Sequence, residues 1–123
     1  MKVNRCIKNL LQFINVLQRN SLERTNWDND LCLEKRTTNI CYNTRVVSLY
    51  NCQGKLIESD YLFDGRIATS SAFRIQDIQD NCCTLLILRK DNDLYISTNQ
   101  YMVVDVGFIC AIKCLGDEQI KNL

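Results

Sequence analysis

Cysteine is the residue type in this chain with the greatest capacity for chemistry, because eight of the 123 residues carry a thiol. A thiol can act as a nucleophile, bind a metal ion or form a disulfide bond. The chain contains no histidine, the residue that usually serves as the general base for a nucleophilic cysteine and that often binds metal beside it. The eight positions are Cys6, Cys32, Cys41, Cys52, Cys82, Cys83, Cys110 and Cys114.

The sequence disfavours both catalysis and metal binding. It has no histidine to serve as a general base, no C-x-x-C redox motif and no glycine-rich phosphate loop. Cys110 and Cys114 are spaced like zinc ligands, but closed zinc sites take their thiolates from tight turns, and an extended strand splays them apart. We therefore predict no catalytic residue, no metal site and no cofactor. A cysteine-ligated zinc module and a cysteine-dependent enzyme remain the alternatives.

Strand geometry limits which cysteines can bond to each other. If residues 101–115 form one strand, Cys110 and Cys114 lie about 13 Å apart at ~3.3 Å per residue, whereas a disulfide needs Cα atoms within roughly 7 Å. The adjacent Cys82 and Cys83 point to opposite faces of their strand. In these apolar runs a cysteine can also serve as a small core residue. The cysteines with polar neighbours are better candidates for bonds within or between chains: Cys6, Cys32, Cys41 and Cys52.

The spacing of apolar residues predicts one helix followed by strands. Apolar residues recur at three- and four-residue steps in the first segment, which predicts a helix over residues 1–20 with its core stripe at Ile7, Leu10, Leu11, Ile14 and Leu17. Asn4 is the expected N-cap, and Asn20 is the expected stop. A neighbouring subunit is an alternative partner for this helix. Residues 21–44 are polar and predict a connector with one short strand at 31–33.

From residue 45 onward, short strands alternate with turn residues. The pattern predicts a hairpin over 45–51 and 55–59, then strands at 72–78, 82–89 and 93–97, and a long closing strand at 101–115. Residues 82–89 are apolar on both faces, which is typical of a central strand. We therefore predict a single domain of the mainly β class: a jelly-roll-like β-sandwich over 45–123, preceded by the N-terminal α-helix.

Composition narrows the possible partners. The formal net charge is +1, so no electrostatic attraction to nucleic acid or to anionic membranes is expected. No apolar run approaches the roughly 20 residues that span a bilayer, and the first 20 residues lack the apolar block of a secretion signal. A high cysteine content usually marks an oxidising compartment, so the thiols and the missing signal point in opposite directions.

Several motifs resemble those of one family. Val104-Asp105-Val106 and Cys110-Ala111-Ile112-Lys113-Cys114-Leu115 are similar to the closing signature of the spore coat protein Y/Z family, the cysteine-rich outer coat and exosporium crust proteins of endospore-forming bacteria. Phe73-Arg74-Ile75, with Cys82 and Thr84-Leu85 after it, resembles another family segment. The stretches 45–56 and 6–18 resemble its strand–turn–strand and its N-terminal helix. Phe108 stands where the family commonly carries a further cysteine.

This resemblance implies a structural role without a catalytic centre. It implies that the protein, like members of the spore coat protein Y/Z family, assembles with itself and with other spore coat or exosporium proteins into a disulfide-stabilised layer at the spore surface. The mother-cell cytoplasm makes such proteins without a signal peptide, and lysis later exposes them to oxidation, which reconciles the thiols with the missing signal. A subunit of a disulfide-linked spore-surface fibre is the alternative within this class. A monomeric binding protein is compatible with the same fold class.

In this role the cysteines divide into two groups. As candidates for bonds between chains we expect Cys6, because it lies in a terminal segment, and then Cys32 and Cys41 in the connector. Inside the sandwich we expect Cys82 or Cys83 to bond with Cys110 or Cys114. Cys52 is left unassigned. Eight cysteines permit 105 complete pairings, so this assignment is one hypothesis among many.

Overall fold

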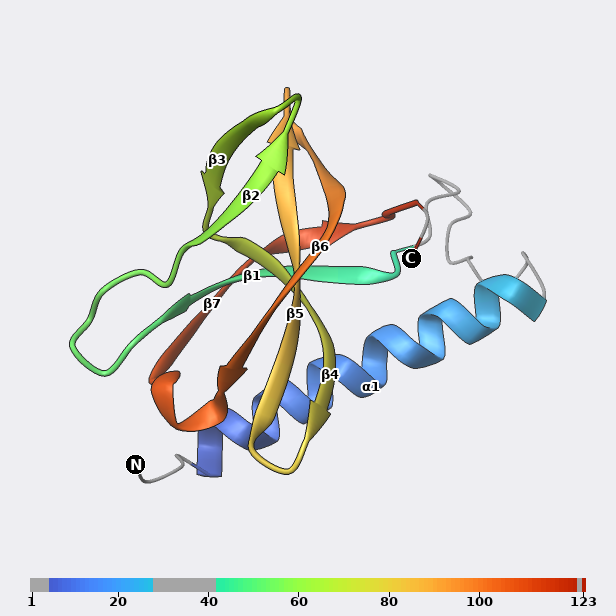
Figure 1. Cartoon of the computed structure of the whole chain (residues 1–123). Coiled ribbons are helices and arrows are strands. Elements are labelled where there is room, and N and C mark those ends of the chain that lie inside the picture. Colours follow the sequence, from blue (N-terminus) through green and yellow to red (C-terminus); the bar gives the residue numbers. More distant parts are fainter. Residues whose placement is uncertain (1–4, 28–41, 122) are drawn as a thin grey trace.

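The computed structural model describes residues 5–27, 42–121 and 123, and for residues 20–27 it describes the backbone only. Helix α1 (Arg5–Trp27) comes first and a series of antiparallel strands follows (Figure 1). The strands, with one short 3-10 turn, are β1 (Thr44–Tyr50), β2 (Ser59–Phe63), β3 (Arg66–Ser70), β4 (Ala72–Gln79), β5 (Cys82–Asp91), β6 (Leu94–Asp105), η2 (Val106–Phe108) and β7 (Ala111–Glu118).

In the described part of the chain the strands form two sheets. The larger has five strands in the order β6-β5-β4-β1-β7, each antiparallel to its neighbours, and the smaller pairs β2 with β3. In Figure 1, β1 and β7 run across the direction of β4, β5 and β6, so the large sheet is strongly twisted. The predicted mainly β fold with an N-terminal helix is confirmed.

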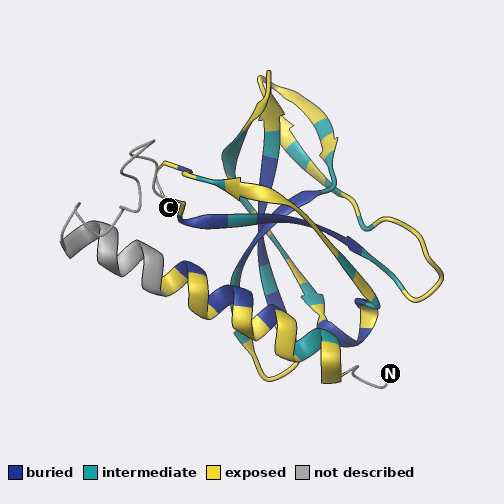
Figure 2. Cartoon of the chain, turned by 180° about the vertical axis from the view of Figure 1, so that it is seen from behind, coloured by how far each residue is buried: buried dark blue, intermediate teal, exposed yellow. Residues whose placement is uncertain are grey.

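The core lies on both faces of the large sheet. On one face, Phe73, Ile75 and Leu85 pack with Leu11 and Ile14 of α1, and all five are fully buried. Figure 2 shows α1 lying across this face with its buried positions turned to the strands. On the other face, a smaller cluster gathers Val46, Ala72, Leu86, Leu88 and Ile120. Strand β5 contributes to both clusters, which explains why its sequence is apolar on both sides.

Helix α1 is longer than predicted and is rotated about its axis. It continues to Trp27 instead of stopping at Asn20, because the good helix formers Leu22, Glu23 and Arg24 follow that asparagine. Leu10 and Leu17 were predicted in the core stripe, but they are 38% and 42% exposed. Their places against the sheet are taken by two amides, Asn15 and Gln18, which are buried.

The Gln18 side chain explains this rotation. Strands β1 and β4 are in register at Val47 and Phe73, so the antiparallel pair of the same type two residues further along would join Arg45 to Ile75. That pair does not form. Instead the Gln18 Nε2 donates to the Ile75 carbonyl at 2.7 Å, and its Oε1 accepts from the Arg45 amide at 2.9 Å. The glutamine amide thus occupies the place of a missing rung in the ladder.

Arg74 joins the same two strands on the opposite face of the sheet. Its Nε donates to the Thr44 hydroxyl at 2.8 Å, and a terminal nitrogen donates to the Asn43 carbonyl at 3.3 Å. Only 4% of Arg74 is exposed, and this burial lowers the pKa of its guanidinium from the ordinary value. The diverging ends of β1 and β4 are therefore held by polar side chains on both sides.

Two predicted strand assignments need correction. The closing segment 101–115 is broken, because η2 and a short connection separate β6 from β7. Asp105 starts this turn by accepting a hydrogen bond from the Gly107 amide at 2.7 Å. Upstream, β6 runs continuously from Leu94 through the predicted gap, and Asn99 adopts a positive φ of 61° there, where the register against β5 shifts.

The predicted hairpin forms only next to its turn, where the Asn51 amide donates to the Lys55 carbonyl and the Ile57 amide donates to the Leu49 carbonyl, both at 2.8 Å. Leu56 forms a single bridge with Tyr50, and β1 takes its long-range partners from β4 and β7 instead. The predicted strand at 31–33 and the expected N-cap Asn4 lie outside the described residues.

Replacing Gln18 tests the glutamine bridge. Gln18→Ala leaves the Ile75 carbonyl and the Arg45 amide without their partners, so we expect the free energy of unfolding to fall by about 2–4 kcal/mol. Urea denaturation measures this loss. Gln12→Ala, an exposed glutamine on the same helix, is the matched control and should change stability by less than about 0.5 kcal/mol. Equal stability of the two variants would contradict the bridge.

Candidate functional site

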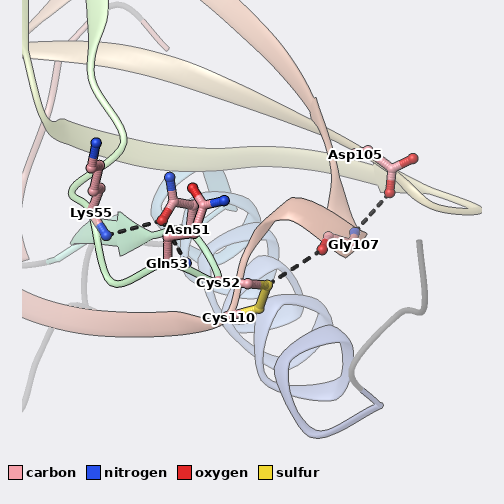
Figure 3. The surroundings of a disulfide bond; sticks show 7 residues. All are labelled: Asn51, Cys52, Gln53, Lys55, Asp105, Gly107 and Cys110. Atoms are coloured by element: carbon pink, nitrogen blue, oxygen red, sulfur yellow. Dashed lines mark hydrogen bonds between the residues drawn. A yellow bond between two sulfur atoms is a disulfide. The ribbon is translucent and has the colours of Figure 1, made fainter.

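A disulfide bond joins Cys52 to Cys110 across 58 residues of sequence, with the two Cα atoms 4.9 Å apart. Cys52 lies in the turn after β1, and Cys110 lies in the connection that leads from η2 into β7 (Figure 3). The bond ties these two connections together at one end of the large sheet. It is the feature of the described residues on which the sequence hypothesis bears most directly.

Backbone and side-chain hydrogen bonds shape the turn that carries Cys52. The Asn51 side chain accepts from the amides of Gln53 and Lys55, both at 2.9 Å, as Figure 3 shows. The Gly54 amide donates to the Asn51 carbonyl at 3.0 Å, and a φ of 80° at Gly54 suits a residue without a side chain. The turn is therefore fixed by its own residues and presents Cys52 in one position.

The segment that carries Cys110 is fixed in the same way. The Ile109 amide donates to the Val106 carbonyl at 3.0 Å, which closes the short turn, and the Cys110 amide donates to the Tyr50 carbonyl at 2.9 Å. Ile109 and Val106 are fully buried in the main core. The Cys52 sulfur lies 3.8 Å from the Gly107 carbonyl oxygen. Packing and hydrogen bonding thus bring the two sulfurs together from elements far apart in sequence.

This bond corrects the predicted pairing. Cys110 was expected to bond with Cys82 or Cys83, but its partner is Cys52, the cysteine left unassigned. The structure has no disulfide at Cys82, Cys83 or Cys114, so the predicted bridge through them is not formed. The reason is the broken closing strand, because Cys110 lies in a connection and not on the strand that was expected to face β5.

Cys82 and Cys83 point to opposite faces of β5, as predicted. Cys82 is exposed, whereas Cys83 is fully buried in the main core. Burial raises the pKa of the Cys83 thiol to about 12, and the negative charge of Asp77 acts in the same direction. Cys83 therefore stays a protonated, unreactive core residue at neutral pH.

The remaining described cysteines lie at the surface. Cys114 is exposed on β7, an edge strand whose only partner in the described sheet is β1. Cys6 is exposed near the start of α1. Cys32 and Cys41, the other candidates for bonds between chains, lie outside the described residues. The surface thus carries cysteines on three separate elements, α1, β5 and β7.

The arrangement of the described side chains bears on the alternative of a zinc-binding module. Among the side chains that the structure describes, no group of three from cysteine, aspartate and glutamate is placed to share a metal ion. Cys110 cannot ligate zinc beside Cys114 while its sulfur is bonded to Cys52. No helix in the described residues combines the length and apolar character needed to cross a membrane.

No family model matches the chain, and no curated protein or solved structure is significantly similar to it. The resemblance to the spore coat family therefore rests on the short motifs quoted from the sequence.

The bond between Cys52 and Cys110 was not predicted from the sequence, although one turn motif points to it. Gly107 follows Asp105 by two residues, and Asp-x-Gly is typical of a turn. A turn there ends the closing strand and frees Cys110 to meet the Cys52-Gln53-Gly54 turn.

Removing the disulfide should destabilise the fold. For a closed loop of this length the bond contributes about 2–4 kcal/mol, mainly by restricting the unfolded chain. We expect the double variant Cys52→Ser, Cys110→Ser to lose that amount in urea denaturation. Cys114→Ser, an exposed cysteine outside the bond, is the control and should stay within about 0.5 kcal/mol of the unchanged protein. A double variant with an unchanged midpoint would contradict this role.

The two adjacent cysteines of β5 should differ in reactivity. Treating the folded protein with iodoacetamide at pH 8 should modify Cys82 and leave Cys83 unmodified, because Cys82 is exposed to the reagent, whereas Cys83 is buried and its pKa is raised to about 12. Peptide mass spectrometry measures both sites. In denaturant the two cysteines should react alike, which serves as the control. Modification of Cys83 at the rate of Cys82 in the folded protein would show that β5 is not buried on that face.

Proposed function

We propose that the protein is a structural subunit that assembles with copies of itself and becomes cross-linked by disulfide bonds. The observation that carries this proposal is the placement of exposed cysteines on three separate elements, α1, β5 and β7. A subunit with one bonding point can form only dimers, whereas a subunit with several can form chains, rings or layers. Surface cysteines in this arrangement suit a polymer more than an enzyme.

The open edge of the large sheet supports assembly. Strand β7 pairs with β1 on one side, and its other side has no strand partner among the described residues. An unpaired edge presents backbone donors and acceptors to another chain, and the sequence has no proline to block it. A copy that bound along this edge would approach the exposed Cys114. Recognition and cross-linking would then use the same strand.

The internal disulfide fits the same role. The Cys52–Cys110 bond closes a loop within one subunit and leaves the exposed Cys82 and Cys114 for bonds between subunits. Between chains, a disulfide has mainly a kinetic effect, because the subunits cannot separate until the bond is cleaved. A layer built in this way would resist heat and dilution and would respond to reductant.

The outer layer of a bacterial spore is the setting that we propose for this polymer. Support comes from the similarity of the 104–115 segment to the closing signature of the spore coat protein Y/Z family. In that setting the subunit would assemble with itself and with other coat or exosporium proteins. The abundance of cysteine agrees with a final location that is exposed to oxidation.

Electrophoresis of the oxidised, full-length protein tests the proposal. We expect species larger than a dimer without reductant, which collapse to monomer with reductant and are unaffected by EDTA. The double variant Cys82→Ser, Cys114→Ser should give shorter species, because two bonding points are removed. Electron microscopy of the same samples should show polymer. Oxidised protein that runs wholly as monomer would overturn the proposal, and dissociation by EDTA alone would favour the zinc module instead.

A further inference from the structure

Strand β7 forms one edge of the large sheet, and alternate residues along it turn their backbone groups towards β1. The printed bonds of β1 fix which residues these are. The Leu49 carbonyl faces the 55–57 segment, where the Ile57 amide donates to it at 2.8 Å. The next carbonyl, that of Tyr50, faces the other way and accepts from the Cys110 amide at 2.9 Å. Tyr50 is paired with Ala111, so Ala111 turns its backbone groups towards β1.

The same alternation places two residues of β7 with their backbone groups directed outward. Lys113, two residues after Ala111, is paired with Ser48 and faces β1. Ile112 and Cys114 therefore direct their N–H and C=O groups away from β1, where β7 has no strand partner among the described residues. Such groups can pair with a strand of another chain.

This edge carries a disulfide and a thiol at equal distances from Ile112. Cys110, two residues before it, is bonded to Cys52 (Figure 3), and Cys114, two residues after it, is exposed and not in a disulfide. A two-fold axis at Ile112 would pair the edge with its own copy in antiparallel order. Each Cys114 would then lie opposite Cys110 of the partner subunit. The edge is thus complementary to itself, which favours a second copy over an unrelated chain.

We propose that two subunits pair antiparallel along β7, around a two-fold axis at Ile112, and that each Cys114 exchanges with the Cys52–Cys110 disulfide of the partner subunit. This inference rests on the proposed function, since it names one surface and one bond of the assembly. Opposed Cα atoms of a hydrogen-bonded antiparallel pair lie about 5.5 Å apart, which is a distance that a disulfide spans.

Charge and strand geometry favour this register over its neighbours. Pairing centred on Lys113 would set two lysines directly opposite each other, which is destabilising. Pairing centred on Cys114 would extend into the bulge at Leu115, a residue without a partner on β1. Pairing centred on Ile112 uses only the regular part of β7. It places Lys113 opposite the small, uncharged Ala111 of the partner subunit.

The exchange needs no external oxidant, because the subunit already holds a disulfide. The Cys114 thiol loses its proton to water, and its thiolate attacks the Cys110 sulfur of the partner subunit. A bond between Cys114 and Cys110 forms, while the bond between Cys110 and Cys52 breaks. Its electron pair leaves with the Cys52 sulfur, which takes up a proton. One disulfide replaces another, so the numbers of disulfides and of thiols stay the same.

The surroundings of the disulfide suit this exchange. Cys52 is exposed, so water can solvate the thiolate that leaves. The turn around Cys52 is also held by hydrogen bonds to Asn51, and Cys110 is held by its amide bond to Tyr50. Both segments therefore keep hydrogen bonds that do not depend on the disulfide. Each exchange also makes Cys52 a new surface thiol, through which a further subunit can be joined.

The experiment follows the full-length monomer, with its Cys52–Cys110 bond verified, at pH 8 in degassed buffer containing EDTA and no oxidant. Non-reducing electrophoresis gives the rate of dimer formation, and peptide mass spectrometry identifies the bonds. We expect a dimer that contains a Cys114–Cys110 bond and a free Cys52 thiol. Cys114→Ser removes the nucleophile, and the double variant Cys52→Ser, Cys110→Ser removes the disulfide. Both should remain monomeric under these conditions.

Two substitutions at one exposed position test the register. Ala111→Lys would face Lys113 of the partner subunit and should slow dimer formation about threefold or more, whereas Ala111→Glu should speed it by a similar factor. Gln12→Lys adds the same charge on α1, away from β7, and should leave the rate unchanged. All three variants should keep the melting temperature of the unchanged protein, because Ala111 and Gln12 are exposed.

The remaining outcomes separate this inference from the proposed function. Equal rates for Ala111→Lys and Ala111→Glu would overturn the pairing around Ile112. Dimers of Cys114→Ser that form as fast as those of the unchanged protein would overturn the exchange. If the oxidant-free protein stays monomeric but forms larger disulfide-linked species in air, the inference fails while the proposed function stands. If no linked species forms under either condition, both fail.

Discussion

The insertion of one glutamine amide between β1 and β4 is the constraint on which the rest of the structure depends. Gln18 bonds to Ile75 and Arg45, which an uninterrupted ladder would pair two residues beyond Val47 and Phe73. Because the side chain fills that gap, the strands can diverge there without leaving their backbone groups unpaired. The same two bonds attach α1 to the sheet and set its rotation. The exposure of Leu10, Phe13 and Leu17 on α1 is thus a consequence of how the sheet opens.

Two further side-chain amides use the same device elsewhere in the described chain. Asn43 accepts from the Ile120 amide at 3.0 Å and donates to the Ile120 carbonyl at 2.9 Å, so it holds the segment that follows β7. Gln100 bonds in the same paired manner to Leu62, at 2.9 Å in both directions, and joins β6 to the β2–β3 ribbon. An amide side chain offers the same donor and acceptor as a peptide group. Where strand pairing is interrupted, one side-chain amide therefore supplies the hydrogen bonds that the backbone groups would otherwise lack.

These amides also bear on which edge stays open. Strand β6 is an edge of the large sheet, but its Gln100 is bonded to β2, so the ribbon lies against part of that edge. No comparable bond attaches a described element to the outer side of β7. An edge strand without cover is a surface on which another chain can add a strand. The asymmetry between the two edges therefore favours β7 for contacts between copies.

The sequence predicted the elements whose burial follows from apolar spacing, and it failed where a polar residue decides the packing. The alternation in 72–78 and the apolar run in 82–89 correctly placed β4 and β5, because apolar side chains must leave water whatever their partners are. The helix was also found, but its orientation was not, since glutamine within a helix normally indicates an exposed position. Nothing in the spacing shows that Gln18 completes a ladder between strands that are formed later in the chain.

The cysteine assignments failed for a related reason and led to a sharper division of roles. The pairing depended on whether residues 101–115 remain extended, and the turn at Asp105–Gly107 removes Cys110 from the strand. Of the described thiols, burial then separates Cys83, which is kept protonated in the core, from Cys82 and Cys114 at the surface. Because reactivity follows access to solvent, fold geometry alone selects which sulfurs can join two chains. A cysteine-rich sequence therefore specifies its cross-links only through the strands and turns that place each thiol inside or outside.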